Sequence, residues 1–397
     1  MKLAHLSDLH LGFRQYERLT PRGSNQREAD VALALKRAVD DLIEQKPDCI
    51  VIAGDVFNAV RPTNAAILTL FTELHRLHIG LPDSAIIVVA GNHDTPRSVE
   101  TWSILRLYEA LGVQVAVDVP RRITLPKLDA AILAVPHSAV AQAERPALRP
   151  EPGVAHNILV IHAEVDGVFA FDKGAVEYGS GVVTRAELGA AHWDYVALGA
   201  YHVARELEKN MWYSGSLDYV SHNPWGELVD EKRHKRPGKG YLLVDLPGTK
   251  VTFRSIEAPR RFQDLPPIDA TDKTAAELDA EIAAVVKKVK PAVDDMVIRL
   301  IVNNVSRGIA KDLDHEAIRA LKTRALNFHL DLRRPPPPER EVGMPTPGGK
   351  ALTLPETVKD FLSRRPLDAD LDREEFVRIG TEFVEKAGAG TREEGVR

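Results

Sequence analysis

Short apolar runs that end in acidic, imidazole or amide side chains recur through the first 200 residues, and they constrain the fold more than any other feature. The residues at these run ends are Asp8, His10, Asp55, Asn92, His93, Asp94, His162 and His202. Helical periodicity separates the runs, and this alternation predicts an α/β layered architecture with a β core flanked by helices. Ligands of α/β sheets bind at the carboxyl ends of strands, so we expect these side chains to share one site.

The predicted elements of the first domain, residues 1–258, follow from the two periodicities. Strands are predicted at residues 2–8, 48–55, 85–94, 130–137, 157–164 and 194–202. Helices are predicted at residues 25–45, 63–78 and 98–111. A hairpin that turns at Pro247 and Gly248 is predicted to join residues 241–246 to 250–256 and to close the domain.

The chain changes character after this hairpin. Residues 259–333 combine a helical pattern at 274–289, one strand at 296–303 and a short helix near 314–322. Such a sequence is too short for a second large core, and it predicts a small α+β capping domain.

The last part of the chain reads as a linker and a helical arm. Residues 334–350 belong to a stretch that holds six prolines and three glycines in eighteen residues, which predicts an extended linker. Residues 351–397 are predicted to form a partner-binding helical segment, with short amphipathic helices near 355–363 and 372–387. A helix pair of this length buries little surface by itself, so we expect it to clasp a partner helix, although docking on its own domain is the alternative.

Length and composition set further bounds. The 397 residues are too many for one ordinary core, so two or three domains are expected. No stretch approaches about eighteen consecutive apolar residues, and Asp8 interrupts any signal-peptide core, so we expect a cytoplasmic protein without a transmembrane helix. The net charge of −5 gives no global nucleic-acid signature, but it is compatible with a local basic patch.

The residue types at the run ends suit a site for two divalent cations. Asp8 and His10 are two residues apart, where an extended backbone points both side chains the same way. Asp55 follows Gly54, which lets the turn run close to a metal, and one carboxylate can bridge two cations. Carboxylate, imidazole and amide donors without a thiolate favour Mn²⁺, Fe²⁺ or Zn²⁺. Two such cations about 3.5–4 Å apart clamp a phosphate and lower the pKa of a bound water.

Two of these residues are candidates for catalysis. His93 follows Asn92 directly, so a ligating Asn92 would let His93 project toward the scissile phosphate and act as general acid for the leaving oxygen. Asp94 is predicted to orient that imidazole through a hydrogen bond. A single Asp after a Gly is usually a turn residue and a lone His is usually structural, but the ordered combination of five run ends favours the site.

Six signature segments resemble those of the calcineurin-like metallophosphoesterases, and most closely those of the SbcD-type DNA double-strand-break repair nucleases. These segments are DLHLG, GDVFN, GNHDTPRS, VIHAEVDG, ALGAYHVARE and YSGSLD, and they lie within about residues 1–260. The resemblance implies a four-layer α/β/β/α sandwich and makes His93 the catalytic histidine. It implies one metal held by Asp8, His10, Asp55 and His202, and a second held by Asp55, Asn92 and His162.

The same resemblance implies cofactors and partners. It implies two divalent ions, typically Mn²⁺, and hydrolysis of DNA phosphodiester bonds by exonuclease and endonuclease action in double-strand-break repair. It also implies a nucleoid-associated homodimer, for which the helices at 63–78 and 98–111 are candidate surfaces, and docking of the C-terminal helices onto an SbcC-like ATPase. A phosphodiesterase or phosphatase for small substrates is the second hypothesis, but it leaves the cap and the Pro-rich arm without a use.

One position departs from the pattern of the family. The last signature is usually G-H-x-H, and its first histidine ligates the second metal, whereas this chain reads Gly199, Ala200, Tyr201 and His202. Alanine has no donor atom, so the second metal is expected to be weak, exchange-prone or completed by water, unless another residue such as His137 or Asp166 compensates. A third hypothesis follows, in which the chain is a catalytically weakened DNA-binding scaffold.

Several residues are weaker candidates for substrate contacts. The basic stretch at 231–240 includes Lys232 and Arg233, which could grip phosphates, although a solvated basic hairpin is equally compatible. Tyr201 could stack on a base, as could Tyr213 and Trp225, with packing in the core as the alternative. Arg97, just past the third run, could contact the substrate phosphate.

Overall fold

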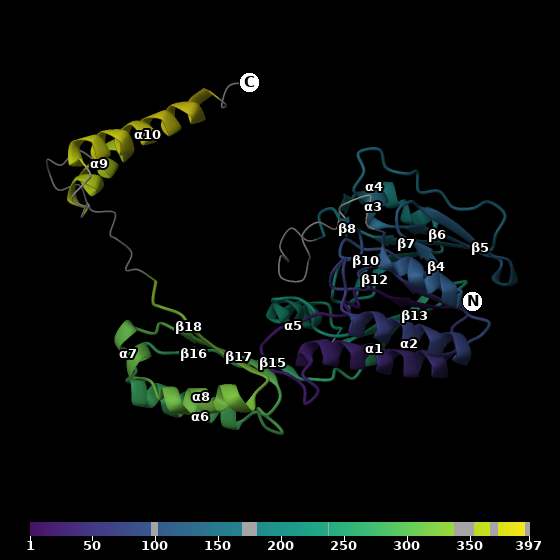
Figure 1. The fold of residues 1–397 in the computed structure, drawn as a ribbon, viewed down its shortest axis with the longest axis horizontal. Helices are drawn as coiled ribbons and strands as arrows, with labels where there is room; N and C mark the ends of the chain where they lie inside the picture. Colours follow the sequence, from purple (N-terminus) through teal and green to yellow (C-terminus); the bar gives the residue numbers. More distant parts are fainter. Residues whose placement is uncertain (97–101, 169–180, 237, 337–352, 366–371, 394–397) are drawn as a thin grey trace. The chain divides into compact units, whose positions relative to one another are not determined.

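The computed structural model describes residues 1–96, 102–168, 181–236, 238–336, 353–365 and 372–393. The chain divides into two units, Met1–Arg334 and Pro335–Arg397, and each is described by itself. Figure 1 shows the first unit as layered sheets and helices and the second as a helical segment. The linker predicted at 334–350 lies almost entirely outside the described residues.

The first sheet of the large unit has six strands in the order β14-β13-β1-β2-β3-β4. Its strands are β1 (Lys2–Leu6), β2 (Cys49–Ile52), β3 (Ala85–Val89), β4 (Gln114–Ala116), β13 (Lys239–Asp245) and β14 (Lys250–Ile256). The first four run parallel, and the predicted hairpin β13–β14 adds two antiparallel strands beside β1. The carboxyl ends of β1, β2 and β3 therefore lie at one edge of the sheet.

The second sheet also has six strands, in the order β11-β12-β10-β7-β6-β5. Its strands are β5 (Arg121–Leu125), β6 (Ala130–Val135), β7 (His156–His162), β10 (Tyr195–Gly199), β11 (Arg205–Glu208) and β12 (Met211–Tyr213). The four central strands are parallel to one another. A short pair, β8 (Glu164–Val165) with β9 (Val182–Val183), follows β7.

The two sheets pack face to face, which the alternation of side chains explains. Successive residues of a strand point to opposite faces, so a strand covered on both sides reads as a continuous apolar run. In β2, Val51 joins the core between the sheets, where it lies with Ile158 and Ala197 of the second sheet. Its neighbours Ile50 and Ile52 join the core on the outer side.

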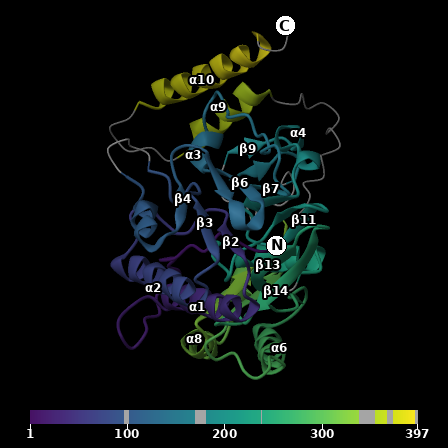
Figure 2. The same ribbon diagram turned by 90° about the vertical axis from the view of Figure 1, so that its right-hand side faces the viewer.

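Helices cover both outer faces, so the unit has α, β, β and α layers. On the first sheet lie α1 (Gln26–Gln45), α2 (Asn64–Gly80) and the 3-10 helix η1 (Ile104–Leu111). Figures 1 and 2 both show α1 and α2 side by side along this face. On the second sheet lie the short helices α3 (His137–Val140) and α4 (Arg185–Leu188), with the single turns η2 (Pro126–Leu128) and η3 (Ala190–His192) nearby in the chain. The predicted layered fold is confirmed.

A smaller α+β part completes the first unit. Its sheet contains β15 (Phe262–Asp264), β16 (Ile268–Asp269), β17 (Val297–Asn303) and β18 (Asn327–Leu332), all parallel to β17. Its helices are α6 (Ala275–Lys287), α7 (Arg307–Asp312) and α8 (His315–Arg324), and they enclose a separate apolar core. One strand is predicted here from the sequence, whereas the structure has four. β15 and β16 are too short to show a period of two, while β18 alternates polar and apolar residues over six positions and its signal was missed.

Two further helical regions differ from the sequence-based expectation. The helix predicted at 98–111 is described only as η1, and residues 97–101 lie outside the described part of the chain. The basic stretch at 231–240 is no hairpin. It continues the helix α5 (Pro224–Arg233), which starts with proline at its first position, a favourable helix beginning.

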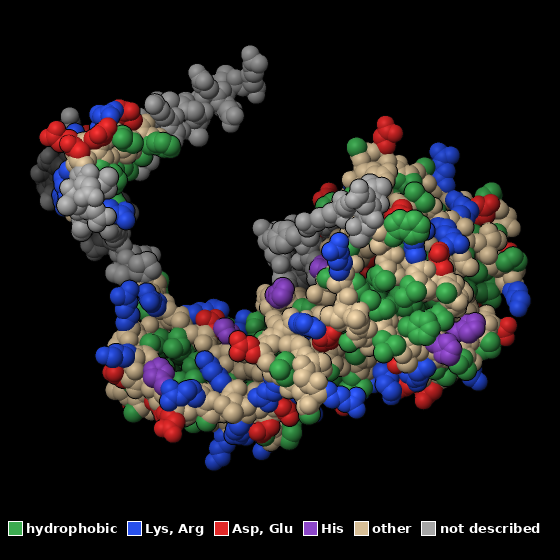
Figure 3. All heavy atoms as spheres, in the orientation of Figure 1, with side chains coloured by type: hydrophobic (Ala, Val, Ile, Leu, Met, Phe, Trp, Pro, Cys, Tyr) green, Lys and Arg blue, Asp and Glu red, His purple; other side chains and the backbone are tan. Residues whose placement is uncertain are grey.

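The second unit consists of α9 (Leu354–Arg364) and α10 (Arg373–Glu393). Gly380 allows α10 to approach α9 closely, because a side chain there would meet Leu362 at 2.3 Å. Three large apolar side chains of this unit, Phe361, Ile379 and Phe383, stay exposed. Figure 3 shows hydrophobic side chains on the surface of these helices beside acidic ones.

Candidate metal centre

Five strand ends bring their polar side chains together between the two sheets. The loops after β1, β2 and β3 carry Asp8, His10, Asp55, Asn92 and His93, and the second sheet supplies His162 from β7 and His202 from the loop after β10. Three groups of these residues have ligand atoms within 4.8 Å of one another: Asp8, His10 and His202; His10, Asp55 and His93; and Asp8, Asp55 and His162. Residues from distant parts of the sequence therefore share one small volume.

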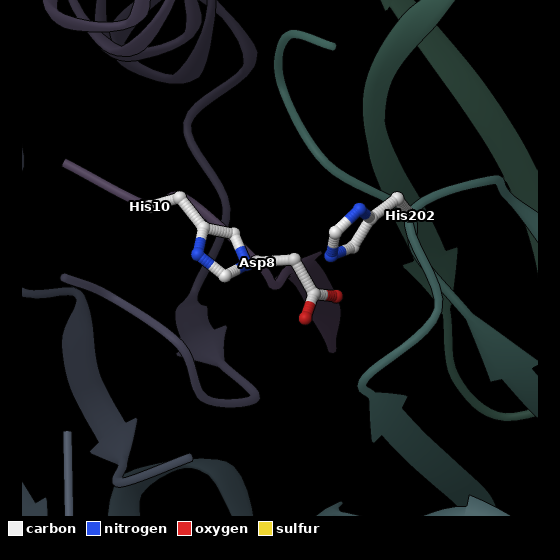
Figure 4. A group of neighbouring side chains, drawn as sticks. All are labelled: Asp8, His10 and His202. Carbon is white, nitrogen blue, oxygen red and sulfur yellow. The ribbon is translucent and has the colours of Figure 1, made fainter. Parts of the chain in front are cut away.

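The first ligand set is Asp8, His10 and His202, which Figure 4 shows with both imidazole rings directed toward the carboxylate. The His10 and His202 rings lie edge to face, 5.0 Å apart between centroids. The Asp8 carboxylate accepts hydrogen bonds from the Ser7 hydroxyl at 2.5 Å and from the backbone N–H of Ala200 at 3.1 Å. All three ligand side chains are fully buried, so they are fixed by the fold before any cation arrives.

The second ligand set is Asp55, Asn92 and His162. His162 Nδ1 lies 2.9 Å from the carbonyl oxygen of Ala53, which can only accept, so Nδ1 carries the hydrogen. The other nitrogen, Nε2, then faces Asn92 Oδ1 at 3.0 Å and Asp55 Oδ2 at 3.3 Å. Three electron-pair donors thus point at one another, and this contact is favourable only when a proton or a metal cation lies between them.

The charges of this second set follow from the same geometry. Burial alone would raise the pKa of Asp55, but the imidazole of His162, helped by His10 and His93, lowers it below the ordinary range. Burial alone would lower the pKa of His162, but the Asp55 carboxylate raises it to about 9. Each group stabilises the charged form of the other, as expected for a buried site built to hold positive charge.

Backbone strain is concentrated in the same loops. Asp8, His10, Asp55 and Ala200 all have positive φ, with values of 53°, 45°, 48° and 110°. Such conformations are uncommon for residues other than glycine and cost of order 1–3 kcal/mol in the less favourable cases. Strain of this kind persists where the surrounding structure over-determines it, and it clusters at functional sites.

Two glycines allow the loops to approach this closely. A Cβ at Gly54, which has φ of +99°, would lie 2.2 Å from His162 Nδ1. A Cβ at Gly91 would lie 2.0 Å from Asp55 Oδ1. Both positions exclude every other residue, because the atoms that a side chain would displace belong to the ligand set itself.

His93 and Asp94 lie beside the ligands, but in a different relation from the predicted one. The carboxylate of Asp94 accepts hydrogen bonds from the backbone N–H groups of Val56, Phe57 and Gly91 at 2.9–3.0 Å. The ring of His93 is held through Nδ1 by the carbonyl oxygen of Asn58 at 2.8 Å. Asp94 therefore ties the loop after β2 to the loop after β3. The prediction that it orients the His93 ring is corrected, because neighbouring side chains in this turn point in different directions.

The aromatic candidates for substrate stacking are corrected as well. Tyr201 is fully buried, its hydroxyl donates to Asp230 at 2.8 Å, and its ring packs edge to face on Tyr213. Tyr213 is also fully buried, and Trp225 is 9% exposed beneath the guanidinium of Arg299. These rings are core residues, because each finds partners on every side within the fold and no face is left for a base.

The remaining candidates for substrate contacts are two exposed residues and one that lies outside the described part of the chain. Lys232 and Arg233 are exposed at the end of α5, where Arg233 pairs with Asp230 at 2.9 Å. Arg97 lies outside the described residues. The three clusters of possible ligands in the described part of the chain include neither His137 nor Asp166, so compensation at Ala200 by either residue stays a prediction.

Several residues around the site carried little signal in the sequence. Ser214 hydrogen bonds to the Ser7 hydroxyl at 2.8 Å and so supports Asp8 from the second sheet. Glu227 and Lys239 form a buried ion pair beside His202, and Lys239 holds the pKa of Glu227 at about 2 against the effect of burial. Ser214 lies in the signature YSGSLD, which could have pointed to it, but no local pattern marks the other two.

The residues present fit a pair of divalent cations. The Asp55 Oδ2 atom is buried and accepts no hydrogen bond from the described residues, a costly state for a carboxylate oxygen unless a cation satisfies it. The contact between His162 Nε2 and two oxygens is satisfied by a proton or by such a cation. The donor set of carboxylate, imidazole and amide suits Mn²⁺, Fe²⁺ or Zn²⁺. Divalent metal binding is thus the chemistry for which this arrangement is built.

Comparison with known proteins agrees with this geometry. Residues 1–164 match the sequence model of the family described as calcineurin-like phosphoesterase, a segment that runs from β1 to the start of β8. This segment is less than half of the chain, and it agrees with the calcineurin-like metallophosphoesterase relationship that the motifs predicted.

The chain is also related to proteins named DNA double-strand break repair protein Mre11. The protein of Sulfurisphaera tokodaii is 27% identical over 269 residues, which cover 66% of this chain and 64% of the relative. That of Methanocaldococcus jannaschii is 27% identical over 271 residues, with 65% and 66% covered. That of Sulfolobus acidocaldarius is 25% identical over 299 residues, with 73% and 71% covered. The predicted relationship to double-strand-break repair proteins is confirmed.

The share of each relative that the alignments cover determines which of its properties can be stated of this chain. The first two alignments span slightly less than two thirds of the relatives' own length. Activity, substrates and partners therefore belong to the proposal below. In the described ranges, no helix combines the length and the apolar character needed to cross a bilayer.

Proposed function

We propose that this chain is a metal-dependent DNA nuclease that hydrolyses phosphodiester bonds in double-strand-break repair. The observation that carries the proposal is the buried meeting of His162 Nε2, Asn92 Oδ1 and Asp55 Oδ2, which calls for a cation at the point where both sheets end. The relatives named as DNA double-strand break repair proteins support DNA as the substrate.

The proposal assigns the ligands as two overlapping groups. One cation is held by Asp8, His10, Asp55 and His202, and the other by Asp55, Asn92 and His162. When bound, two such cations neutralise charge on the phosphate and make hydroxide available near neutral pH. Mn²⁺ is our proposed metal, since it accepts both imidazole and oxygen donors. Exonuclease and endonuclease action are both included, as the resemblance to SbcD-type nucleases implies.

His93 supplies the proton in this proposal. Its Nδ1 donates to the Asn58 carbonyl oxygen at 2.8 Å, so Nε2 is the nitrogen whose protonation can change. Its backbone N–H donates to Asp55 Oδ1 at 2.9 Å, which fixes the ring beside the bridging carboxylate. His93 is only half-buried, unlike the ligand histidines, so a substrate can reach it. It donates a proton from Nε2 to the leaving oxygen, a step typically worth 10²–10⁴ in rate.

Binding of DNA and of a partner uses other surfaces. We propose that the exposed Lys232 and Arg233 contact phosphates near the site, since they lie about one and a half turns along α5 from Glu227, which faces His202. The exposed Phe361, Ile379 and Phe383 of the second unit fit a helical partner, proposed as an SbcC-like ATPase. A homodimer completes the proposal, with α2 as its described candidate surface, where Leu68 is 65% exposed.

A second candidate function rests on Ala200. The loop after β10 places this alanine, 1% exposed, with its backbone N–H on the Asp8 carboxylate, where it adds no side-chain donor to the second ligand set. A chain that holds one cation firmly and the other weakly would retain DNA without cleaving it. This scaffold would serve assembly with the ATPase.

The test is cleavage of linear duplex DNA by the full chain with Mn²⁺, read against turnover of bis-p-nitrophenyl phosphate and against metal content. Cleavage of DNA with two cations bound supports the nuclease. Turnover of the small ester alone supports a phosphodiesterase for small substrates. Retention of DNA without cleavage, even with the ATPase partner and Mn²⁺, supports the scaffold.

The role of His93 has a matched control. His93→Gln should lower the rate of DNA cleavage by roughly 10²–10⁴ while leaving metal content near that of the unmodified chain. His78 is an exposed histidine of α2, and His78→Gln makes the same change far from the ligands. Equal losses in the two variants would contradict the assignment of His93.

A further inference from the structure

The buried ion pair of Glu227 and Lys239 lies directly behind a ligand histidine and is used by no step above. Glu227 is fully buried in α5, and Lys239, at the start of β13, is 2% exposed. The two side chains form an ion pair, and a second acid, Glu231, lies 3.7 Å from Lys239 Nζ. Burying such a pair is expensive, and apolar residues in its place are often neutral or stabilising.

This pair holds His202 at two points. Glu227 Oε1 lies 3.7 Å from His202 Nδ1, on the ring. Lys239 Nζ donates to the backbone carbonyl oxygen of His202 at 2.8 Å. The same carbonyl oxygen also accepts from the backbone N–H and the hydroxyl of Ser216, both at 3.1 Å.

We propose that Glu227 is a positioning residue for His202, and that Lys239 holds Glu227 in place. The inference rests on the proposed function, because it concerns a ligand of the proposed metal site. A ligand histidine commonly gives its second ring N–H to a carboxylate, which fixes the tautomer and the direction of the ring. Glu227 facing Nδ1 selects Nε2 as the ligand nitrogen of His202.

A purely structural role is the competing explanation. Glu227 Oε1 also accepts from the backbone N–H of Ser221 at 3.2 Å, and so it stabilises the chain just before α5. Lys239 lies over the ring of Tyr219 at 4.6 Å, within the packing of the same region. The 3.7 Å contact with the ring of His202 is longer than a hydrogen bond of about 2.7–3.2 Å, so geometry alone does not separate the two roles.

Paired variants separate them. Glu227→Gln removes the closer of the two acids that face Lys239 and leaves only Glu231 at 3.7 Å, so it is expected to lower both stability and metal affinity. The double variant E227Q/K239M removes the ion pair and is expected to recover part of the stability, because Glu231 keeps its hydrogen bonds from Tyr219 and Gly238. Metal affinity should stay low in the double variant, since the carboxylate behind His202 is still missing. Lys239→Met alone keeps the carboxylate but removes the group that holds it, so it should lose stability and a smaller part of the affinity than the double variant.

The measurements are Mn²⁺ titration of the full chain, the visible absorption spectrum of its Co²⁺ form, and urea unfolding without metal. We expect Glu227→Gln and the double variant to bind the tighter cation roughly 10–100-fold more weakly, with a shifted Co²⁺ spectrum. Glu73→Gln is the matched control, because Glu73 is a buried acid paired with Arg76 in α2, away from the ligands.

Each outcome of these measurements supports or overturns the positioning role of Glu227. Unchanged affinity and an unchanged Co²⁺ spectrum in the double variant overturn the positioning role and leave Glu227 structural. A loss equal to that of Glu73→Gln overturns it as well. If the unmodified chain binds neither Mn²⁺ nor Co²⁺, the proposed function itself fails. If Glu227→Gln does not fold, the double variant and Lys239→Met still give the comparison.

Discussion

The two ligand sets share Asp55 as a close neighbour, but the chain supports them in different ways. The first set, Asp8, His10 and His202, is backed by side chains from elsewhere in the fold, with Ser7 and Ser214 behind Asp8 and Glu227 near His202. The second set, Asp55, Asn92 and His162, is backed by main-chain groups, among them the Ala53 carbonyl oxygen and the His93 N–H.

Because of this difference, the two ligand sets should respond to different kinds of substitution. Main-chain support depends on loop geometry, which Gly54, Gly91 and the Asp94 carboxylate fix, so it fails only when a loop moves. Side-chain support can be removed one group at a time. The second set also lacks a side-chain donor at position 200, where the chain has alanine, so we expect it to bind its cation more weakly than the first set binds its own.

Replacing Asp55 should have the largest effect, since it breaks both halves at once. Asp55→Asn removes a charge that faces His162 at 3.3 Å and His10 at 3.8 Å. We expect metal affinity to fall by more than the roughly 10–100-fold that loss of an outer-shell partner costs. The check is unfolding by urea with and without Mn²⁺. In the unmodified chain, Mn²⁺ at about 100 times the Kd should add about 2.7 kcal/mol per site, and the variant should lose most of this gain.

Removing the Asp94 carboxylate should affect stability next most strongly. Asp94→Ala leaves the N–H groups of Val56, Phe57 and Gly91 without their acceptor, at roughly 1–3 kcal/mol for each buried donor. Asp94→Asn keeps one acceptor oxygen and should cost less. Urea unfolding without metal measures both. If the second set depends on main-chain support, Asp94→Ala should bind the cation of the second set more weakly while it still binds that of the first set. An equal loss of affinity for both cations would contradict this.

The sequence predicts the ligands of this site, but it does not predict all of the side chains that support them. The ligands lie at the ends of apolar strands, and strand ends of a parallel sheet meet at one edge, so their grouping follows from local patterns. The support of the first set depends on Ser214, Glu227 and Lys239. Ser214 lies 207 residues from its partner Ser7, and no local pattern reveals such contacts.

The wrong predictions have physical reasons of the same kind. Tyr201 is an aromatic residue beside a ligand, and the sequence alone does not say whether its ring faces solvent or the core. Asp94 is adjacent to His93 in sequence, but in a turn adjacent side chains diverge. In the fold, the central strands of the two large sheets were indicated by apolar runs, whereas β16, with only two residues, and the helix α5 were not.

A side-chain donor at position 200 should strengthen cation binding by the second ligand set, which we expect to be the weaker one. Ala200→His is expected to tighten the second cation roughly 10-fold or more and to raise phosphodiesterase turnover, while the first cation is unaffected. Ala200 is 1% exposed and has φ of 110°, so added bulk could cost about 1–3 kcal/mol in stability.

The control for this change is Ala200→Leu, which adds bulk without a donor atom. Its unfolding free energy without metal should resemble that of Ala200→His, while its metal titration should stay at or below that of the unmodified chain. Equal metal stoichiometry and equal turnover for the unmodified chain and Ala200→His would show that the second set is already complete.

The smallest effect should come from removing one side-chain support of the first set. Ser7 donates to Asp8 Oδ2 at 2.5 Å, so its oxygen accepts the hydrogen of Ser214 at 2.8 Å, and Ser214→Ala removes that second bond. One hydrogen bond contributes about 0.5–1.5 kcal/mol, so affinity for the first cation should fall by about tenfold or less. Mn²⁺ titration compares it with Ser84→Ala, which removes a bond to the Pro47 carbonyl oxygen away from the ligands. Because the second set has no contact with Ser214, its cation should be unchanged, and a change there would mean that the two halves are not supported separately.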